Sequence, residues 1–377
     1  MVTTDMKVKI TLNLLLIAMI ALGMQPAPAQ ARSNAQPLSG VQLSSGLRPG
    51  ARAANDAQVI NVPGAGNLDL QAAINQVPDG GVIEISAGIY PSPAEGFYIQ
   101  DARKSFTIQA ASGEQVILDG GHVNRVLAVR NLPGNENNSV VFKGLTFAGG
   151  YTKTDGVAGG VTVYRANVTF IDCTFRDHRK DNSPGQTVGA AVTIADHSTV
   201  FFFNALFENN TSENGGAGIG VRDSVLYVHN SIFNNNQTFV APNLGSWPGG
   251  GAINAGNSIL RVSNSRFEGN QVASHGGAIW AIGNWGNPAG MDIIIANATF
   301  VGNQARQHTY PNHGPAEGGA VVIEDKTRLR VYNSRFILNK GMIGGAMSIF
   351  RARAEIYSSA FLGNQATDTL PTSGFGG

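Results

Sequence analysis

The sequence contains one cysteine, Cys173, so no disulfide can form within the chain. A chain of this length without disulfides must be held together by its apolar core. Charged residues make up only 14% of the sequence and the formal net charge is +1, so a basic surface for nucleic acid is not expected. Glycine is frequent, at 48 residues, but it has no three-residue period, which excludes collagen and indicates many tight turns.

The N-terminus carries a long apolar run with the features of an export signal. Lys7 and Lys9 precede an uncharged apolar stretch from Ile10 to Met24, and two Ala-x-Ala sites follow it. This pattern predicts a secretory signal peptide over residues 1–31. The run is too short for a membrane anchor, which needs about 20 apolar residues, so no membrane span is expected after cleavage. Residues 32–57 lack an apolar period and are predicted to be a flexible leader.

A repeat of roughly thirty residues follows, a length typical of solenoid proteins. Its clearest mark is Phe-x-x-Asn, and a degraded copy begins at Phe175, where His178 takes the place of the asparagine. After most copies, at variable distance, comes Gly-Gly-Ala, as at Gly250. The intact copies are Phe207–Asn210, Phe233–Asn236, Phe267–Asn270, Phe300–Asn303, Phe336–Asn339 and Phe361–Asn364.

Short strands with one buried face precede each phenylalanine. Apolar side chains stand seven and five residues before it, and this period of two is typical of a strand packed on one side. Three residues before the phenylalanine comes Asn, as at Asn264, or in some copies Asp or Ser. No stretch of helical period separates these strands. The apolar pairs are Val168/Phe170, Val200/Phe202, Leu226/Val228, Leu260/Val262, Ile293/Ile295, Leu329/Val331 and Ala354/Ile356.

A unit this small cannot bury its apolar face alone, so neighbouring units must stack like positions on one another. We expect Phe to lie on Phe and Asn on Asn, with a buried asparagine ladder that includes Asn264. The prediction is an all-β, right-handed parallel β-helix over residues 58–377, with an N-terminal capping helix over Leu68 to Val77. Two other repeat folds fit the sequence less well. A β-propeller needs four strands in about 40 residues, and a leucine-rich repeat carries Leu where this chain carries Gly and Phe.

The paired Phe-x-x-Asn and Gly-Gly-Ala motifs resemble the polymorphic outer membrane protein repeats of bacterial surface proteins, over residues 140–377. The capping segment resembles the helix that opens many proteins of the pectin-lyase-like superfamily. The resemblance implies a secreted or cell-surface passenger, often adhesive, located in the extracellular space or on the outer-membrane surface. Because the sequence stops at Gly376 and Gly377, where the next Gly-Gly-Ala would fall, we expect the C-terminus to be truncated.

Pectate lyases, polygalacturonases and pectin methylesterases share this fold, but a fold alone does not confer their chemistry. Their active-site motifs Asn-Thr-Asp, Asp-Asp, Gly-His-Gly and Arg-Ile-Lys are absent from the sequence. The nearest charged constellation is residues 176–181, which we interpret as a long turn. In a catalytic interpretation Asp177 and Asp181 bind calcium or a uronate and Lys180 is the base. In the simpler interpretation the segment is a solvated loop.

A second pair of carboxylates is also a candidate for catalysis. Glu208 and Glu268 hold equivalent positions two coils apart, about 10 Å, which is the upper edge for an inverting glycosidase. Arg176 precedes Glu208 by one coil, so a surface salt bridge between them is the simpler interpretation. The seven histidines lack metal-ligand spacing. No metal site and no cofactor are therefore predicted, and calcium enters only if the protein is a lyase.

Two features are better candidates for ligand binding. The turns between Phe-x-x-Asn and Gly-Gly vary in length and should gather at one corner, where Trp247 and Trp280 lie in or near them. The outward positions of the strands before the phenylalanines are aromatic, above all Phe203, Tyr227 and His229, and aromatic rings stack on sugars or anchor a protein partner. Alternatively, a long turn such as 237–248 covers these rings. The other outward rings are Phe201, Tyr332 and Tyr357.

Two functions remain open from the sequence. The favoured one is a non-catalytic surface protein that displays loops for adhesion and binds an extracellular glycan or a surface protein. The alternative is a polysaccharide lyase or glycoside hydrolase with a divergent active site. The absence of family active-site motifs favours the first.

Overall fold

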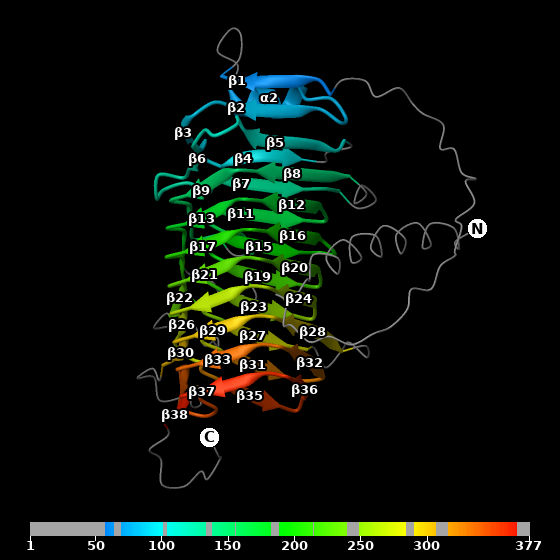
Figure 1. Ribbon diagram of the computed structural model, residues 1–377. Helices are drawn as coiled ribbons and strands as arrows, with labels where there is room; N and C mark the ends of the chain where they lie inside the picture. The colour runs from blue at the N-terminus through cyan, green and yellow to red at the C-terminus, as the bar shows by residue number, and fades with distance from the viewer. Residues whose placement is uncertain are drawn as a thin grey trace, which may run out of the picture. The chain divides into compact units, whose positions relative to one another are not determined.

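Figure 1 shows the computed structural model of the chain. The predicted signal peptide, residues 32–56 of the predicted leader, Trp247 and Trp285 lie outside the residues that it describes. No helix in the described part of the chain is long and apolar enough to cross a membrane. The described residues are 57–63, 69–100, 104–132, 138–154, 156–181, 188–213, 215–239, 249–283, 290–306 and 316–367.

The described strands form four sheets, which we call A to D, and from β8 onward the chain passes through A, B, D and C in each coil. Sheet A contains β1 (Val59–Val62), β2 (Val82–Ile85), β5 (Phe106–Ala110), β8 (Ser139–Lys143), β12 (Asn167–Ile171), β16 (Thr199–Phe203), β20 (Val225–His229), β24 (Ile259–Ser263), β28 (Met291–Ala296), β32 (Thr327–Tyr332) and β36 (Arg353–Tyr357). Sheet B contains β3 (Gly88–Pro91), β6 (Val116–Asp119), β9 (Leu145–Ala148), β13 (Thr174–Arg176), β17 (Leu206–Glu208), β21 (Ile232–Asn234), β25 (Arg266–Glu268), β29 (Thr299–Val301), β33 (Arg335–Ile337) and β37 (Ala360–Leu362). Sheet C contains β4 (Phe97–Gln100), β7 (Leu127–Arg130), β11 (Val161–Tyr164), β15 (Val192–Ala195), β19 (Ile219–Arg222), β23 (Ile253–Gly256), β27 (Ile279–Ile282), β31 (Val321–Glu324) and β35 (Met347–Phe350). Sheet D contains β10 (Tyr151–Thr152), β14 (Arg179–Lys180), β18 (Thr211–Glu213), β22 (Gln237–Phe239), β26 (Gln271–Val272), β30 (Gln304–Ala305), β34 (Lys340–Gly341) and β38 (Gln365–Ala366).

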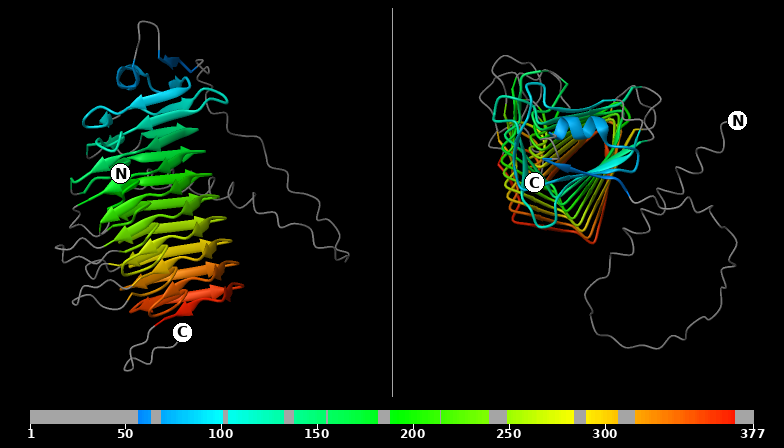
Figure 2. Two further views of the ribbon diagram at one scale, coloured as in Figure 1. Left: turned by 90° about the vertical axis from the view of Figure 1, so that its left-hand side faces the viewer. Right: turned by 90° about the horizontal axis from the view of Figure 1, so that it is seen from above.

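Neighbouring strands in each sheet come from successive coils and run parallel, so each coil lies on the one before it. Seen from above, the strands of successive coils superpose around a common interior (Figure 2). The register pairs equivalent repeat positions, as the sequence predicted. Phe207, for example, is opposite Phe233, which is opposite Phe267 one coil further on. The predicted parallel β-helix is confirmed.

The predicted phenylalanine stack forms the centre of the core. Phe175, Phe207, Phe233 and Phe267 are fully buried. Their rings lie face to face, with centroids 4.7, 4.5 and 4.7 Å apart along the series. The apolar pairs of sheet A point into the same interior, because side chains alternate between the two faces of a strand. Each stacked ring adds apolar burial and an aromatic contact, so the core is continuous from coil to coil.

The buried asparagine ladder exists, but it is formed by the asparagine after each phenylalanine and not by the one before it. Asn270 is fully buried, and its amide bonds to Asn303 in the next coil and receives bonds from Asn236. Asn264 is exposed and has a φ of +51°. It stands at the corner between sheets A and B, where asparagine tolerates left-handed backbone better than most residues. The prediction that Asn264 belongs to the buried ladder was wrong.

The predicted capping helix is present as α2 (Leu70–Gln76), shorter than the predicted Leu68–Val77. Asp69 caps its N-terminus by accepting a hydrogen bond from the Ala72 backbone N–H. Leu70, Ala73 and Ile74 are buried against the first coils. The helix thus covers apolar side chains at this end of the sheets.

The Gly-Gly-Ala motif forms the entry to sheet C from the variable turns. Gly250 has a φ of +65°, and a Cβ there would lie 2.0 Å from the Ile253 carbonyl oxygen. A Cβ on Gly251 would lie 2.2 Å from the Gly277 carbonyl oxygen of the next coil. Only glycine fits both positions. The described ends of the variable turns lie between strands of sheet D and strands of sheet C, at the single corner that the sequence predicted.

Candidate functional site

Residues 176–181 do not form the turn that the sequence suggested. Arg179 and Lys180 form β14, and the Lys180 side chain points inward and is fully buried. Its Nζ donates to the Thr154 carbonyl oxygen at 2.7 Å. A two-residue strand of sheet D sends its second side chain into the solenoid, so Lys180 is not placed as a base for a surface substrate. The prediction of that role was wrong.

The carboxylates of this segment are each paired with an arginine. Asp177 Oδ2 accepts from Arg176 Nη1 at 2.8 Å, and Asp181 Oδ1 accepts from Arg179 Nε at 2.8 Å. Asp181 Oδ2 also accepts from the Tyr151 hydroxyl at 3.1 Å. The described residues contain no group of three His, Cys, Asp or Glu side chains that could hold a metal ion. Asp177 and Asp181 therefore do not assemble a calcium site within the described residues.

Glu208 and Glu268 share a column of sheet B with Asn234 between them, as the repeat predicted. Arg176 forms an ion pair with Asp177 and not, as the sequence predicted, with Glu208. Glu268 Oε2 accepts from Arg266 Nε at 2.8 Å, and this hydrogen bond holds the pKa of Glu268 below its usual value. A carboxylate kept ionised in this way is poorly suited to be a general acid.

Trp280 is buried and does not offer a ring at the surface, which corrects the prediction that it is a binding residue. Only 2% of the residue is exposed, and it stands in β27 on the outer side of sheet C. A Cβ on Gly249 would lie 1.7 Å from the Trp280 ring, so the ring packs directly on the bare glycine backbone. The indole Nε1 donates to Glu324 Oε1 at 3.0 Å.

The outer face of sheet A is the surface where the predicted aromatic residues gather. Phe201 and Tyr227 stack with centroids 4.7 Å apart, and Phe203 and His229 lie side by side at an interplanar angle of 60°. All four side chains are partly exposed. Partial burial lowers the pKa of His229, which favours the neutral ring. Residues 237–239 of the turn 237–248 form β22 of sheet D, and residues 240–248 lie outside the described residues.

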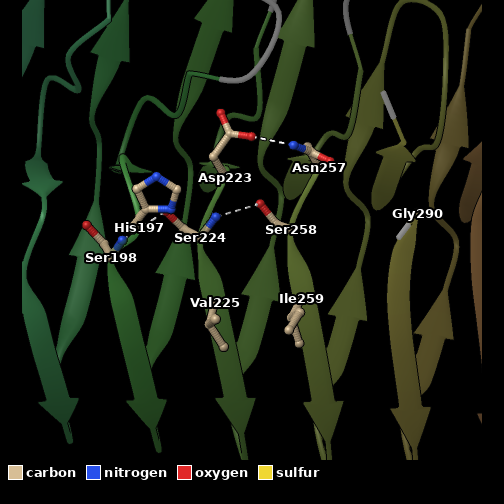
Figure 3. Close-up of a pocket in the computed structure, with 9 residues that line it drawn as sticks. All are labelled: His197, Ser198, Asp223, Ser224, Val225, Asn257, Ser258, Ile259 and Gly290. Carbon is tan, nitrogen blue, oxygen red and sulfur yellow. Dashed lines mark hydrogen bonds between the residues drawn. The ribbon is translucent and has the colours of Figure 1, made fainter. Parts of the chain in front are cut away.

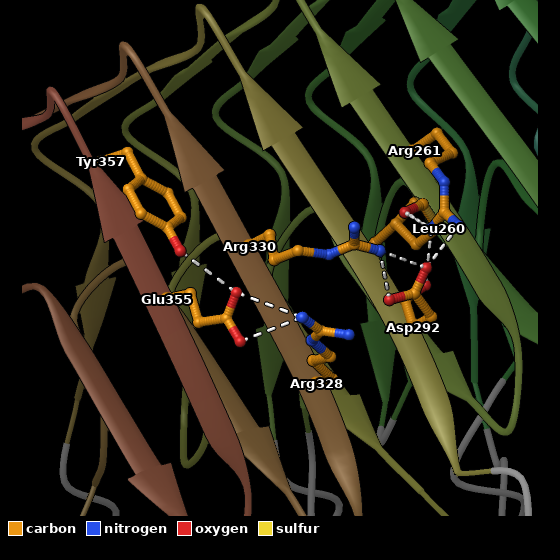
Figure 4. A network of polar contacts seen from close by, with 7 residues as sticks. All are labelled: Leu260, Arg261, Asp292, Arg328, Arg330, Glu355 and Tyr357. Atoms are coloured by element: carbon orange, nitrogen blue, oxygen red, sulfur yellow. Dashed lines mark hydrogen bonds and ion pairs between the residues drawn. The ribbon is translucent and has the colours of Figure 1, made fainter.

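Further along the same face, arginines outnumber carboxylates (Figure 4). Arg261 and Arg330 both bind Asp292, Arg330 Nη2 at 2.7 Å from Asp292 Oδ1. The two guanidinium groups hold the pKa of Asp292 below its usual value against the opposing effect of burial. Arg328 and Arg353 likewise share Glu355, at 3.0 and 2.9 Å.

Four guanidinium groups therefore share two carboxylates, which leaves an excess of two positive charges on this part of the face. Tyr332 and Tyr357 stack beside them at 5.2 Å. We call the aromatic and charged side chains on the outer face of sheet A, from β16 to β36, the A strip. It consists of Phe201, Phe203, Tyr227, His229, Arg261, Asp292, Arg328, Arg330, Tyr332, Arg353, Glu355 and Tyr357.

A groove of about 410 Å³ runs along the edge of the A strip, at the corner between sheets C and A (Figure 3). Val225 and Ile259, which begin their strands of sheet A, form one wall. His197, Asp223 and Asn257 line it from the corner turns, and Asn257 Nδ2 donates to Asp223 Oδ1. These three residues have φ values of +62°, +49° and +51°, so the corner holds polar residues in left-handed backbone.

The A strip and the groove together offer aromatic rings, cationic donors and polar side chains along one line of coils. The rings are suited to stacking on apolar ligand surfaces, and the guanidinium groups to charge-assisted hydrogen bonds with an anion. Sequence reasoning found the rings but missed the arginines and the groove. Arg261 and Arg330 stand in the same outward column as Tyr227, so the period of two could have located them.

Comparisons with known proteins agree with the architecture. The family described as right handed beta helix region matches residues 159–361. No curated protein matches the sequence. Among solved structures, an alginate lyase from Paenibacillus sp. str. FPU-7 is 14% identical, with 80% of this chain and 97% of that chain covered and a TM-score of 0.37.

Two other solved structures have a similar degree of likeness. Pectate lyase Pel9A is 14% identical over 78% of this chain and 67% of that chain, with a TM-score of 0.34. The family 28 exopolygalacturonase of Yersinia enterocolitica is 11% identical over 81% of this chain and 78% of that chain, with a TM-score of 0.33. Likeness of this degree does not bear on activity or ligand.

Proposed function

Because the chain belongs to the right-handed β-helix family, we propose that it is a secreted bacterial surface protein whose A strip binds an acidic extracellular glycan without cleaving it. The observation that carries the proposal is the succession of aromatic rings and surplus arginines along one outer face. The proposed secretion depends on the signal peptide predicted over residues 1–31. An adhesive role follows if the bound glycan is part of another cell or matrix.

The arrangement of the A strip suits an extended polymer better than a compact ligand. Coils repeat at about 4.8 Å, so equivalent side chains form columns parallel to the solenoid axis. Apolar ring surfaces can pack against the C–H faces of sugars, and Arg presents a planar fork that pairs with carboxylate or sulfate. The groove beside the strip adds hydrogen-bonding groups at His197, Asp223 and Asn257.

The excess of positive charge at Arg261, Arg328, Arg330 and Arg353 favours an anionic glycan over a neutral one. An anionic ligand would also neutralise guanidinium groups that now share a carboxylate. Because these pairs are partly exposed, their attraction for a ligand should weaken as salt is added.

We expect the protein to be retained by polygalacturonate or heparin, representing carboxylated and sulfated glycans, and not by neutral dextran. Arg330→Ala and Tyr227→Ala should each weaken binding about tenfold, the factor that corresponds to 1.4 kcal/mol. Arg266→Ala on sheet B is the matched control, since Arg266 also pairs with a carboxylate but lies off the strip. Binding would be measured by biolayer interferometry at two salt concentrations.

Three other outcomes would contradict parts of this proposal. Equal loss of affinity in Arg266→Ala would place the ligand elsewhere. Binding of neutral and anionic glycans alike would remove the role of the arginines. Release of unsaturated sugars in the presence of calcium, followed by ultraviolet absorbance, would support a polysaccharide lyase instead.

A further inference from the structure

The outer side of sheet C holds a second polar cluster, separate from the A strip. Glu324 Oε1 accepts the indole N–H of Trp280 at 3.0 Å and lies 3.9 Å from His275 Nε2. The imidazole and indole rings stack with centroids 5.6 Å apart. Both side chains that flank the carboxyl are nearly buried, His275 at 8% and Trp280 at 2% exposure. We call His275, Trp280 and Glu324 the corner cluster.

The charged groups around Glu324 are mostly of its own sign. Asp325 is adjacent in the chain, buried, and paired with Arg351 at 2.7 Å. Glu317 comes from the turn that leads into β31, and its Oε2 accepts from the Ser348 hydroxyl at 2.8 Å. Arg351, whose charge also acts on Glu324, forms this ion pair with Asp325. A negative charge on Glu324 would sit in a largely buried site beside two other carboxylates.

We infer that the corner cluster is a proton-operated switch, in which loss of the proton from Glu324 strengthens its hydrogen bond to Trp280 but places a third negative charge in this buried corner, so that the corner is most stable while Glu324 is neutral. The neutral acid accepts the indole N–H and adds no charge beside Glu317 and Asp325. Ionisation adds a charge that the indole and the shared arginine only partly offset. The switch concerns this corner of the solenoid and does not depend on the function proposed for the A strip.

The direction of the pH effect follows from the protonation of Glu324. Burial raises the pKa of Glu324 from 4.5 to about 7, and Glu317 and Asp325 act in the same direction, against the Trp280 hydrogen bond and Arg351. Between these two values the folded chain holds a proton that the unfolded chain has lost. Stability from this group is therefore present at pH 4.5 and lost as the pH rises to about 7.

Trp280 makes the switch directly observable, because the emission of an indole responds to a charge that appears at its N–H. The test uses the full chain with Trp247→Phe and Trp285→Phe, so that Trp280 is the only emitter. We expect its emission to titrate with a midpoint near pH 7. Glu324→Gln should abolish the titration, and Glu317→Gln should lower its midpoint because one repelling charge is gone. Glu268→Gln, a surface change on sheet B, should leave it unchanged.

The melting temperature provides a second readout. Relative to Glu324→Gln, the melting temperature of the parent should fall between pH 4.5 and 7, because the contributions of other groups, His178 among them, are common to both proteins. Glu268→Gln should follow the parent. A flat emission profile in the parent would overturn the inference. So would a titration that persists in Glu324→Gln, since it would come from a group other than Glu324. If Glu324→Gln does not fold, the shift of midpoint in Glu317→Gln decides, and an unshifted midpoint rejects the switch.

Discussion

Replacing Asn270 with leucine is expected to lower the free energy of unfolding by about 3–5 kcal/mol, because it removes one rung of a buried hydrogen-bond ladder. The Asn270 Nδ2 donates to the Phe233 carbonyl oxygen at 3.0 Å and to Asn303 Oδ1 at 2.9 Å. Its Oδ1 accepts from the backbone N–H and the side-chain amide of Asn236, at 3.1 and 2.9 Å. Leucine has a similar volume and restores none of these bonds.

The cost is large because the partners stay buried after the substitution. The Phe233 carbonyl and the two Asn236 donors would each lose a bond where water does not reach, and an unsatisfied buried group costs about 1–3 kcal/mol. The Asn303 Oδ1 keeps the backbone N–H of residue 270, at 3.1 Å, so one bond of the rung survives. Asn270 is not in left-handed backbone, so leucine meets no conformational penalty there.

The matched control is Asn264→Leu, the same substitution six residues earlier in the same coil. Asn264 is exposed, and its amide contact with Asn297 is 3.2 Å long. Leucine should cost only about 1–2 kcal/mol there, from the left-handed backbone. Denaturant unfolding followed by circular dichroism would measure both variants. Similar losses for the two, or a larger loss for Asn264→Leu, would mean that the inner ladder is not the stabilising one.

The two asparagine columns also show what the repeat could and could not predict. Both recur in nearly every copy, so recurrence alone does not say which one points inward. The structure separates them by backbone: residues such as Asn204 and Asn230 take a φ near +50° at the corner. The buried Asn236 and Asn270 are in ordinary backbone. The inward direction of the Phe column was unambiguous, because large apolar side chains are usually buried.

The strands of sheet D could not be predicted from the sequence, for a physical reason. Its strands are two or three residues long, and most of their inward side chains are polar or small, so no apolar alternation marks them. Lys180 is the extreme case, a fully buried lysine whose charged neighbours suggested a solvated turn. The inward residues of this sheet are Thr152, Lys180, Ser212, Thr238, Val272, Ala305 and Gly341.

The candidate site was predictable only in part. The outward aromatic residues followed from the strand period, whereas the sharing of Asp292 by Arg261 and Arg330 depends on side-chain geometry across three coils. The corner cluster was even harder to predict from the sequence, because Trp280 and Glu324 are 44 residues apart and come together through the pairing of β27 with β31.

The stability of the chain is also expected to fall in acid because of His178, which replaces asparagine in the buried ladder. Its backbone N–H donates to Asn210 Oδ1 at 3.0 Å, and its Nδ1 accepts from the Gly150 N–H at 2.9 Å. The ring is fully buried, and this burial lowers its pKa from 6.5 to about 3. Protonating Nδ1 would destroy the acceptor that Gly150 uses.

The direction of this pH effect follows from the different pKa of His178 in the folded and the unfolded chain. As the pH falls below 6.5 the unfolded chain binds a proton at this histidine, while the folded chain does not until about pH 3. Stability from His178 is therefore complete above pH 6.5 and is lost progressively on acidification. The loss should reach about 3–5 kcal/mol near pH 3, since each pKa unit corresponds to about 1.4 kcal/mol.

His178→Asn should remove this acid sensitivity, because an amide oxygen can accept from Gly150 without titrating and the amide can extend the ladder beyond Asn210. At pH 7.5 the variant should be as stable as the parent or up to about 1 kcal/mol more stable. Denaturant unfolding between pH 7.5 and 4 would show its curve diverging from that of the parent as the pH falls. His197→Asn, an exposed change in the groove, should leave the parent's profile in place. Parallel profiles for His178→Asn and the parent would mean that His178 already takes up a proton in the folded chain, and that burial in the ladder does not keep it neutral.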